Sequence, residues 1–383
     1  MRSDRIRFYA SAAVFALLLI FTVSKLKVSA EGYPEVSARA AIVYDGETGE
    51  VLYEKAADER LPMASTTKIM SALIVLEQDR LDEKFTVDNE AIKTEGSSMG
   101  LREGDKVSLR DLACGMLLPS GNDAANAAAV RVAGSVDKFV MLMNRRAQQM
   151  GLSDTHFVTP SGLDDYTDEH YSTARDMAKL AHEAMKNIGF REICGLKKAQ
   201  VSFGDPPYDR WLINTNKLLE REGITGIKTG FTDKARRCLV SSCMREGCEL
   251  ICVTLNDPDD WNDHMKLFGH AFGKVEPHRI APPEKEIRIG SADGRELVCT
   301  MPDLIMTMTD RAAQRVEKKI FLPQFVYAPV ETDETVGTVV YELDGKEIAR
   351  RSIRAAHGLE PQKKTAPKAV KLWRKLCRKI KSI

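Results

Sequence analysis

Hydrophobic positions recur with two different periods along the first two thirds of this 383-residue chain. Short β-prone runs on either side of Asp45–Gly49 predict a hairpin. Helical spacing of apolar residues predicts helices at 65–77, 123–133, 174–185 and 261–272. Strand-like runs return at 237–243 and 248–255. We therefore expect an α/β fold, in which one antiparallel sheet is covered by helices and a mainly helical insert spans about 107–190.

The pattern changes after Pro277, Pro282 and Pro283, which mark a boundary. Six short β-prone runs follow, at 286–289, 296–300, 304–308, 314–321, 336–342 and 347–353. Asp-Gly pairs at 293 and 344 are hairpin turn signals. This part contains no catalytic constellation, so we interpret it as a small all-β domain that acts as a spacer or docking module. The predicted organisation is 1–30 signal peptide, 31–276 catalytic domain, 277–358 β-sandwich and 359–383 tail.

The N-terminus has the layout of a secretory signal peptide. Arg2, Arg5 and Arg7 precede an uncharged run of sixteen residues, 8–23, and Val28–Ala30 offers small residues for cleavage. The alternative is an uncleaved anchor, but this run is shorter than the roughly 20 residues that a membrane span needs. We expect export, with the protein acting at the outer face of the cytoplasmic membrane.

The C-terminal tail carries nine basic residues and no acidic ones between Lys363 and Ile383. On a helical wheel its apolar residues, Trp373 among them, occupy one arc and its lysines and arginines the opposite one. That pattern predicts an amphipathic helix that binds an anionic membrane surface. Nucleic-acid binding and a disordered tail are the alternatives. Export argues against the first, and the periodicity argues against the second.

Composition adds little to this interpretation, because the net charge of +1 is an average over the whole chain and does not reveal the concentration of positive charge in the tail. The chain has eight cysteines, and four of them cluster at 238, 243, 248 and 252. Buried reduced thiols are the preferred interpretation, with a Cys243–Cys248 disulfide and a zinc site as alternatives.

Three short motifs carry the chemistry. They are Ser65-Thr66-Thr67-Lys68, then Ser120-Gly121-Asn122, then Lys228-Thr229-Gly230. A serine hydroxyl needs an adjacent base to act as a nucleophile. Three residues along a helix place Lys68 on the same face as Ser65, where a proton acceptor must lie. Each motif is weak alone, but together and in this order they indicate a serine acyl-transfer enzyme.

Longer phrases around these motifs resemble the low-molecular-mass penicillin-binding proteins that are D-alanyl-D-alanine carboxypeptidases. The phrases are at 62–70, 95–99, 119–126, 160–165, 170–176, 214–219 and 226–232. The resemblance covers the predicted catalytic domain almost end to end. It implies the β-lactamase-like, transpeptidase-like α/β fold with a C-terminal β-sandwich, and removal of the terminal D-alanine from peptidoglycan stem pentapeptides. β-Lactam antibiotics would acylate the same serine.

The resemblance also implies a role for each motif residue. Ser65 would attack the peptide carbonyl, Lys68 would accept its proton, and Ser120 would relay a proton to the leaving amine. Asn122 would hold Lys68 and the substrate's peptide group. Lys228 and Thr229 would bind the terminal carboxylate, Gly230 would let the substrate lie along the strand, and the backbone N–H groups of Ser65 and Phe231 would form the oxyanion hole. Neither a metal nor an organic cofactor is expected.

Arg236 departs from the family pattern, since many relatives carry glycine there; it puts substrate preference in doubt more than the reaction. The histidines, His170 included, are interpreted as structural or solvated.

Two rival functions remain open at this stage. A serine β-lactamase would share the motifs, but no convincing deacylating Glu loop precedes Lys228. A non-catalytic cell-wall binding protein would not need the intact Ser65, Lys68 and Ser120. An endopeptidase that cuts crosslinks is a milder variant.

Overall fold

The computed structural model describes residues 33–164 and 166–362. The predicted signal peptide and most of the predicted tail helix lie outside these residues. Contacts divide the chain into two units, and the fold belongs to the second, which begins at Ser37. No helix within the described residues is long and apolar enough to cross a bilayer.

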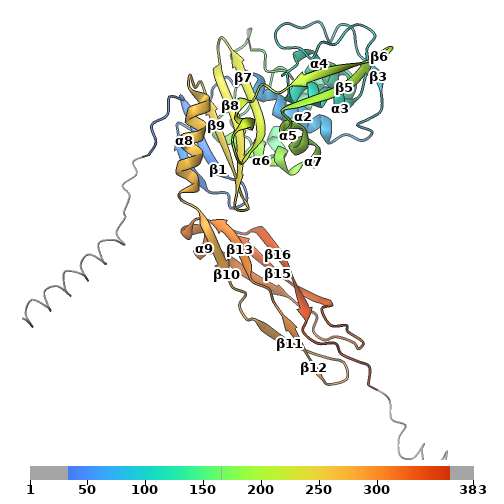
Figure 1. Cartoon of the computed structure of the whole chain (residues 1–383), viewed down its shortest axis with the longest axis vertical. Helices are drawn as coiled ribbons and strands as arrows, with labels where there is room; N and C mark the ends of the chain where they lie inside the picture. The colour runs from blue at the N-terminus through green and yellow to red at the C-terminus, as the bar shows by residue number, and fades with distance from the viewer. Residues whose placement is uncertain (1–32, 165, 363–383) are drawn as a thin grey trace, which may run out of the picture. The chain divides into compact units, whose positions relative to one another are not determined.

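A five-stranded antiparallel sheet forms the centre of the first domain, in the order β2–β1–β9–β8–β7 (Figure 1). The strands are β1 Ala40–Asp45, β2 Val51–Lys55, β7 Ile224–Thr232, β8 Arg236–Arg245 and β9 Cys248–Leu255. The predicted hairpin, β1–β2, and the predicted strands β8 and β9 are confirmed. Strand β7, which carries the Lys-Thr-Gly motif, is an edge strand, so one row of its backbone groups has no neighbouring strand.

Helices cover both faces of this sheet. Helix α8 (Asp260–Phe272) packs on one face, and α6 (Ala174–Lys186) packs on the other (Figure 1). Helix α2 (Lys68–Leu76) lies inside the domain, and every one of its residues is buried, as expected of a helix that is apolar all round. The remaining helices are α3 Leu109–Leu117, α4 Asn122–Ala133, α5 Val136–Gln149 and α7 Ile188–Cys194, with short 3-10 turns η1 Ala64–Thr67 and η2 Lys217–Glu220.

Two small strand pairs of this domain were not predicted from the sequence. Strands β3 (Phe85–Thr86) and β4 (Lys106–Val107) form a short pair, and β5 (Lys198–Gly204) with β6 (Pro207–Ile213) forms a hairpin. The outward face of that hairpin carries Trp211 and Ile213, both exposed.

The C-terminal part is all-β apart from one short helix. Strand β10 (Glu276–Ile280) pairs with β13 (Leu304–Met308). A five-stranded sheet runs in the order β11 (Glu286–Gly290), β12 (Glu296–Thr300), β16 (Lys346–Ala355), β15 (Thr335–Leu343) and β14 (Glu317–Phe321). Leu297, Cys299, Tyr341 and Ile353 belong to a hydrophobic core that is separate from that of the first domain.

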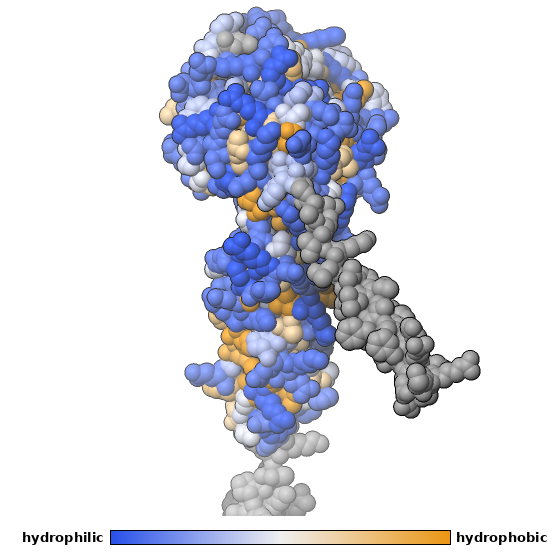
Figure 2. All heavy atoms as spheres, turned by 90° about the vertical axis from the view of Figure 1, so that its left-hand side faces the viewer, coloured by the Kyte–Doolittle hydropathy of each residue, from blue (hydrophilic) through white to orange (hydrophobic). Residues whose placement is uncertain are grey.

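One strand prediction in this part was wrong at its start. The run predicted as a strand at 314–321 begins inside helix α9 (Asp310–Arg315). The Thr309 side chain accepts a hydrogen bond from the N–H of Ala312 and so caps this helix. Figure 2 shows hydrophobic side chains along the visible face of the C-terminal domain, and this domain's exposed hydrophobic residues are Ile305, Phe321, Phe325 and Tyr327.

All seven cysteines in the described residues are buried and carry free thiols. The hairpin of β8 and β9 pairs Cys243 with Leu250 and Cys248 with Arg245, so the two thiols are not cross-strand partners, and the disulfide alternative was wrong. Among the described residues, the one group whose ligand atoms gather closely enough for a metal contains no cysteine; it comprises Glu276, His278 and Asp310.

Candidate active site

Ser65 lies in η1, on the tight turn that leads into α2. The sequence predicted an α-helix from Ser65, but the first turn is 3-10 and the α-helix begins at Lys68. Ala64, directly before the serine, has a φ of 48°, a left-handed conformation that costs free energy for a residue with a Cβ atom. A Cβ atom at Gly162 would lie 2.0 Å from the Ala64 carbonyl oxygen, so this neighbour must be glycine. Strained backbone of this kind is typical of functional sites.

The Lys68 side chain lies directly beneath the nucleophile. Its Nζ is 2.8 Å from Ser65 Oγ, 2.7 Å from Asn122 Oδ1 and 2.6 Å from the carbonyl oxygen of Ser161. The orientation of the Asn122 amide is fixed, because its Nδ2 donates to the carbonyl of Glu95 at 2.8 Å. Lys68 therefore faces two groups that can only accept hydrogen bonds, and one hydroxyl that can do either.

Burial lowers the pKa of Lys68 well below its usual value, and the neighbouring charge of Lys228 lowers it further. A neutral amine has two hydrogens and one lone pair. Asn122 Oδ1 and the Ser161 carbonyl accept the two hydrogens, which leaves the lone pair for the Ser65 hydroxyl. The arrangement thus suits a general base toward Ser65.

Lys228 is buried on β7, and burial lowers its pKa to about 7. Its Nζ donates to the carbonyl of Thr229 at 2.9 Å. The side chain that was expected to bind the substrate's carboxylate thus lies beneath the surface. Only 1% of it is exposed.

Ser120 and Asn122 lie where the chain enters α4. Ser120 has a φ of 67°, a second left-handed residue at the site. The Asn122 N–H donates to the Ser97 carbonyl at 2.7 Å. Asp123 accepts hydrogen bonds from Ser98 Oγ and from the backbone N–H groups of Met99, Gly100, Leu101 and Ala124, at 2.5–3.1 Å. The segment 97–101 is thereby fastened to the N-terminus of α4.

Strand β7 lies close to the nucleophile turn because residue 230 is glycine. A Cβ atom there would be 3.1 Å from the Ser65 nitrogen. Phe231 pairs with Arg237 of β8, whose carbonyl accepts from the Asp257 N–H on the far side at 2.9 Å. The pair is therefore not hydrogen-bonded, and the Phe231 N–H points to the open edge. The backbone N–H groups of Ser65 and Phe231 thus belong to neighbouring segments that both line the cleft.

A cleft of 500 Å³ opens above these groups. Ser65, Ser120, Thr229, Gly230 and Phe231 line it, together with Ser97, Asn214, Thr215, Lys217, Arg237, Asp260 and Trp261. Thr215 Oγ1 and Thr229 Oγ1 share a hydrogen bond of 2.6 Å. No role was predicted from the sequence for the seven residues from Ser97 to Trp261 in this second set, nor for the Ser161 carbonyl. A backbone carbonyl has no sequence signature, and the other residues come from elements whose neighbours in space are far apart in the chain.

His170 is buried behind the nucleophile turn. Its Nε2 is 2.8 Å from Thr67 Oγ1, and its Nδ1 accepts from the Val158 N–H at 2.9 Å. Burial lowers its pKa to about 4, so the ring is neutral at physiological pH. This agrees with the structural role that the sequence suggested.

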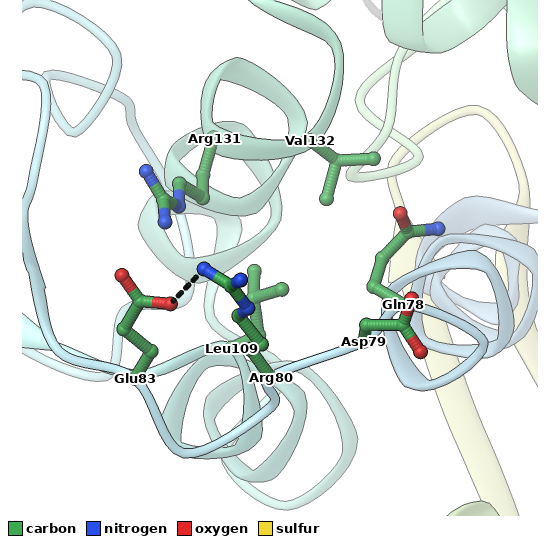
Figure 3. Close-up of a pocket in the computed structure, with 7 residues that line it drawn as sticks. All are labelled: Gln78, Asp79, Arg80, Glu83, Leu109, Arg131 and Val132. Carbon is green, nitrogen blue, oxygen red and sulfur yellow. Dashed lines mark ion pairs between the residues drawn. The ribbon is translucent and has the colours of Figure 1, made fainter.

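A second hollow, of 240 Å³, lies past the C-terminal end of α2 (Figure 3). Arg80 and Arg131 reach into it, and Arg80 forms an ion pair with Glu83 at 3.6 Å. Helix α2 separates it from Ser65 by about 15 Å, and it contains none of the motif residues.

Comparison with known proteins agrees with this site. Residues 27–259 match the family model described as D-alanyl-D-alanine carboxypeptidase, and residues 285–360 match the C-terminal domain of penicillin-binding protein 5. The chain is 33% identical to the D-alanyl-D-alanine carboxypeptidase DacC of Escherichia coli, over 94% of this chain and 93% of that one. It is 30% identical to DacF of Bacillus subtilis, over 84% and 86%.

A solved structure covers both domains. The D-alanyl-D-alanine carboxypeptidase DacD of Francisella tularensis superposes with a TM-score of 0.61 at 28% identity, over 86% of this chain and 95% of that one. The motifs, the geometry around Ser65 and these matches agree, and the chain belongs to the serine D-alanyl-D-alanine carboxypeptidase family of penicillin-binding proteins.

Proposed function

We propose that this protein removes the terminal D-alanine of peptidoglycan stem pentapeptides through an acyl-enzyme on Ser65, with neutral Lys68 as the base. The observation that carries the proposal is the set of three contacts at Lys68 Nζ, which leaves the amine's lone pair toward Ser65 Oγ. The family's action on peptidoglycan peptides and its reaction with β-lactams support the substrate class.

The substrate lies along the open edge of β7 as an added strand, in the cleft above Gly230. Ser65 Oγ transfers its proton to Lys68 Nζ and attacks the carbonyl carbon of the penultimate D-alanine. The N–H groups of Ser65 and Phe231 stabilise the resulting oxyanion. The carbon–nitrogen bond then breaks, and the departing amine of D-alanine receives the proton of Lys68 Nζ through Ser120, which returns Lys68 to its neutral form.

The second half of the reaction releases the shortened peptide. A water molecule loses a proton to the amine of Lys68, and its oxygen attacks the carbonyl carbon of the Ser65 ester. The bond between that carbon and Ser65 Oγ then breaks, and Oγ takes the proton back from Lys68. Asn122 keeps Lys68 in place throughout, and Lys228 lowers the pKa of Lys68 from beneath the strand.

Turnover of two substrates tests this function against the β-lactamase alternative. We expect purified protein to release D-alanine catalytically from a diacetyl-Lys-D-Ala-D-Ala peptide, and penicillin to label it and deacylate slowly. Rapid catalytic hydrolysis of penicillin without D-alanine release would identify a β-lactamase instead. If neither substrate reacts, the protein is a binding or scaffold protein.

We also propose that the exported protein is held at the outer face of the cytoplasmic membrane by its basic tail. The amphipathic pattern between Lys363 and Ile383 supports this. Removal of 363–383 should abolish sedimentation with anionic vesicles and leave turnover of soluble peptides unchanged. Truncated protein that still sediments with vesicles would contradict the tail's role.

A further inference from the structure

Two cationic side chains line the cleft among the described residues, and neither belongs to a motif. They are Lys217, on η2, and Arg237, on β8. Lys68 and Lys228 do not line it, because both are fully buried. A peptide with a free terminal carboxylate brings a negative charge into this cleft. The group that meets this charge must lie at the cleft surface.

Arg237 starts close to the reacting atoms. It lies directly opposite Phe231 in the β7–β8 pair, and Phe231 supplies one N–H of the proposed oxyanion hole. The pair is not hydrogen-bonded, so the two Cα atoms are about 4.5 Å apart. The Arg237 side chain therefore extends into the cleft from the strand just behind the one along which substrate lies.

The guanidinium is held in place from α8. Its Nη2 donates to Asp260 Oδ1 at 2.7 Å, and its Cζ lies 5.3 Å from the centre of the Trp261 ring. Asp260 is buried, with 2% of its surface exposed, and Trp261 also lines the cleft. A guanidinium that is already oriented loses little conformational entropy when it binds a ligand.

Asp260 leaves much of this guanidinium free. Arginine has five N–H donors, and within the described residues Asp260 is the one side chain to which Arg237 donates. The cleft lining also keeps a positive balance, since Lys217 and Arg237 against Asp260 leave one net positive charge. A planar carboxylate can accept two parallel N–H bonds from the free part of the guanidinium.

We propose that Arg237, held by Asp260 and Trp261, recognises the terminal carboxylate of the substrate and makes the enzyme prefer free C-terminal D-alanine. This inference rests on the proposed function and assigns its carboxylate recognition to a residue outside the three motifs. Lys217, exposed on η2, adds positive charge at the mouth of the cleft. Lys228 is buried, and its charge lowers the pKa of Lys68.

The test compares Arg237→Gln with wild type on a diacetyl-Lys-D-Ala-D-Ala peptide and on the same peptide with a C-terminal amide. A charge-assisted bidentate contact is worth about 10- to 150-fold in binding. We expect kcat/KM for the free acid to fall by about this factor, while kcat/KM for the amide changes less than threefold. Arg237→Lys, which keeps the charge but loses the two-pronged contact, should recover part of the preference.

Arg102→Gln is the matched control, because Arg102 is an exposed arginine that does not line the cleft. It should keep the wild-type preference. Equal losses on both peptides in Arg237→Gln would show that Arg237 only braces α8, and an unchanged preference would also overturn the proposal. If Arg237→Gln does not fold, Arg237→Lys decides: an unaltered free-acid preference in that variant contradicts the inference.

Labelling by penicillin separates this result from failure of the proposed function. Wild-type protein that is neither acylated at Ser65 nor able to release D-alanine would overturn both. Active wild-type protein whose preference survives in Arg237→Gln would overturn the Arg237 assignment alone.

Discussion

Two buried lysines share the active site, and burial makes both easier to deprotonate. For Lys68, Lys228 adds to this effect, since a positive charge on Lys228 opposes protonation of its neighbour. Because the pKa of Lys228 is about 7, its influence is greatest below neutral pH, where it carries its charge. The chemistry at Ser65 thus depends on a residue that does not itself line the cleft.

Lys228→Met should make acylation more sensitive to acid. Removal of the Lys228 charge raises the pKa of Lys68, so the neutral form of Lys68 is lost at a higher pH as the solution is acidified. We expect the acidic limb of the pH profile for penicillin acylation to move to higher pH in this variant. The rate constant for acylation of Ser65, measured across pH, checks this. A limb that stays in place would mean that the Lys228 charge does not act on Lys68.

The backbone conformation at Arg236 explains why glycine suits this position. Its φ is 58°, in the left-handed region where a Cβ atom is unfavourable. Arg236→Gly should stabilise the fold by about 0.5–1 kcal/mol, since the relief of strain exceeds the entropy that glycine loses on folding. Urea denaturation measures this change. Arg236→Ala is the control, because it removes the guanidinium but keeps the strained Cβ; equal stability of the two variants would refute the explanation.

At the scale of elements, regular hydrophobic periodicity was enough to predict much of the fold. Helices α4, α6 and α8 and strands β8 and β9 were foreseen, because each buries one clear face or a continuous apolar run. The β5–β6 hairpin was missed because Trp211 and Ile213 place apolar residues on its exposed face. Helix α9 was missed because its six residues are fewer than periodicity can identify.

The candidate site, too, was predicted only where a sequence pattern marks its residues. Helical spacing predicted that Lys68 lies beside Ser65, and the family resemblance predicted that Ser120 and Thr229 belong to the same site. The Ser161 carbonyl and Arg237 were not foreseen. Their roles depend on which segments the fold brings together, and a single sequence does not contain that signal.

Asp123 joins the segment 97–101 to helix α4, so its replacement should destabilise the fold and disturb the active site. Asp123→Asn replaces a carboxylate that accepts four backbone N–H bonds with an amide whose NH₂ group opposes them. Hydrogen bonds to charged groups contribute about 1.5–3 kcal/mol each, so we expect a loss of at least about 2 kcal/mol in unfolding free energy and slower acylation of Ser65. Thermal unfolding and labelling rates check this.

Asp137→Asn is the matched control for that variant. Asp137 also lies in the first turn of a helix, α5, but its side chain is exposed. It should change stability by less than about 0.5 kcal/mol. Similar behaviour of the two variants would show that Asp123 does not fasten the segment 97–101 to α4.

For the whole molecule, the proposed chemistry is confined to the first domain. Every group in the proposed reaction lies between Ser65 and Trp261, in the first domain, whose hydrophobic core is separate from that of the C-terminal domain. The C-terminal β domain matches the C-terminal domain of penicillin-binding protein 5. None of its described residues has a role in the proposed reaction. The proposed reaction therefore depends on one atom of the first domain, Ser65 Oγ.

The position of the penicillin adduct tests this claim most directly. After brief exposure to penicillin, proteolysis and mass spectrometry should place a single adduct, with the mass of the intact drug, on Ser65. Ser65→Ala should show no adduct and keep its thermal unfolding temperature. An adduct on Ser120 or Ser161, or acylation that persists in folded Ser65→Ala, would contradict the account.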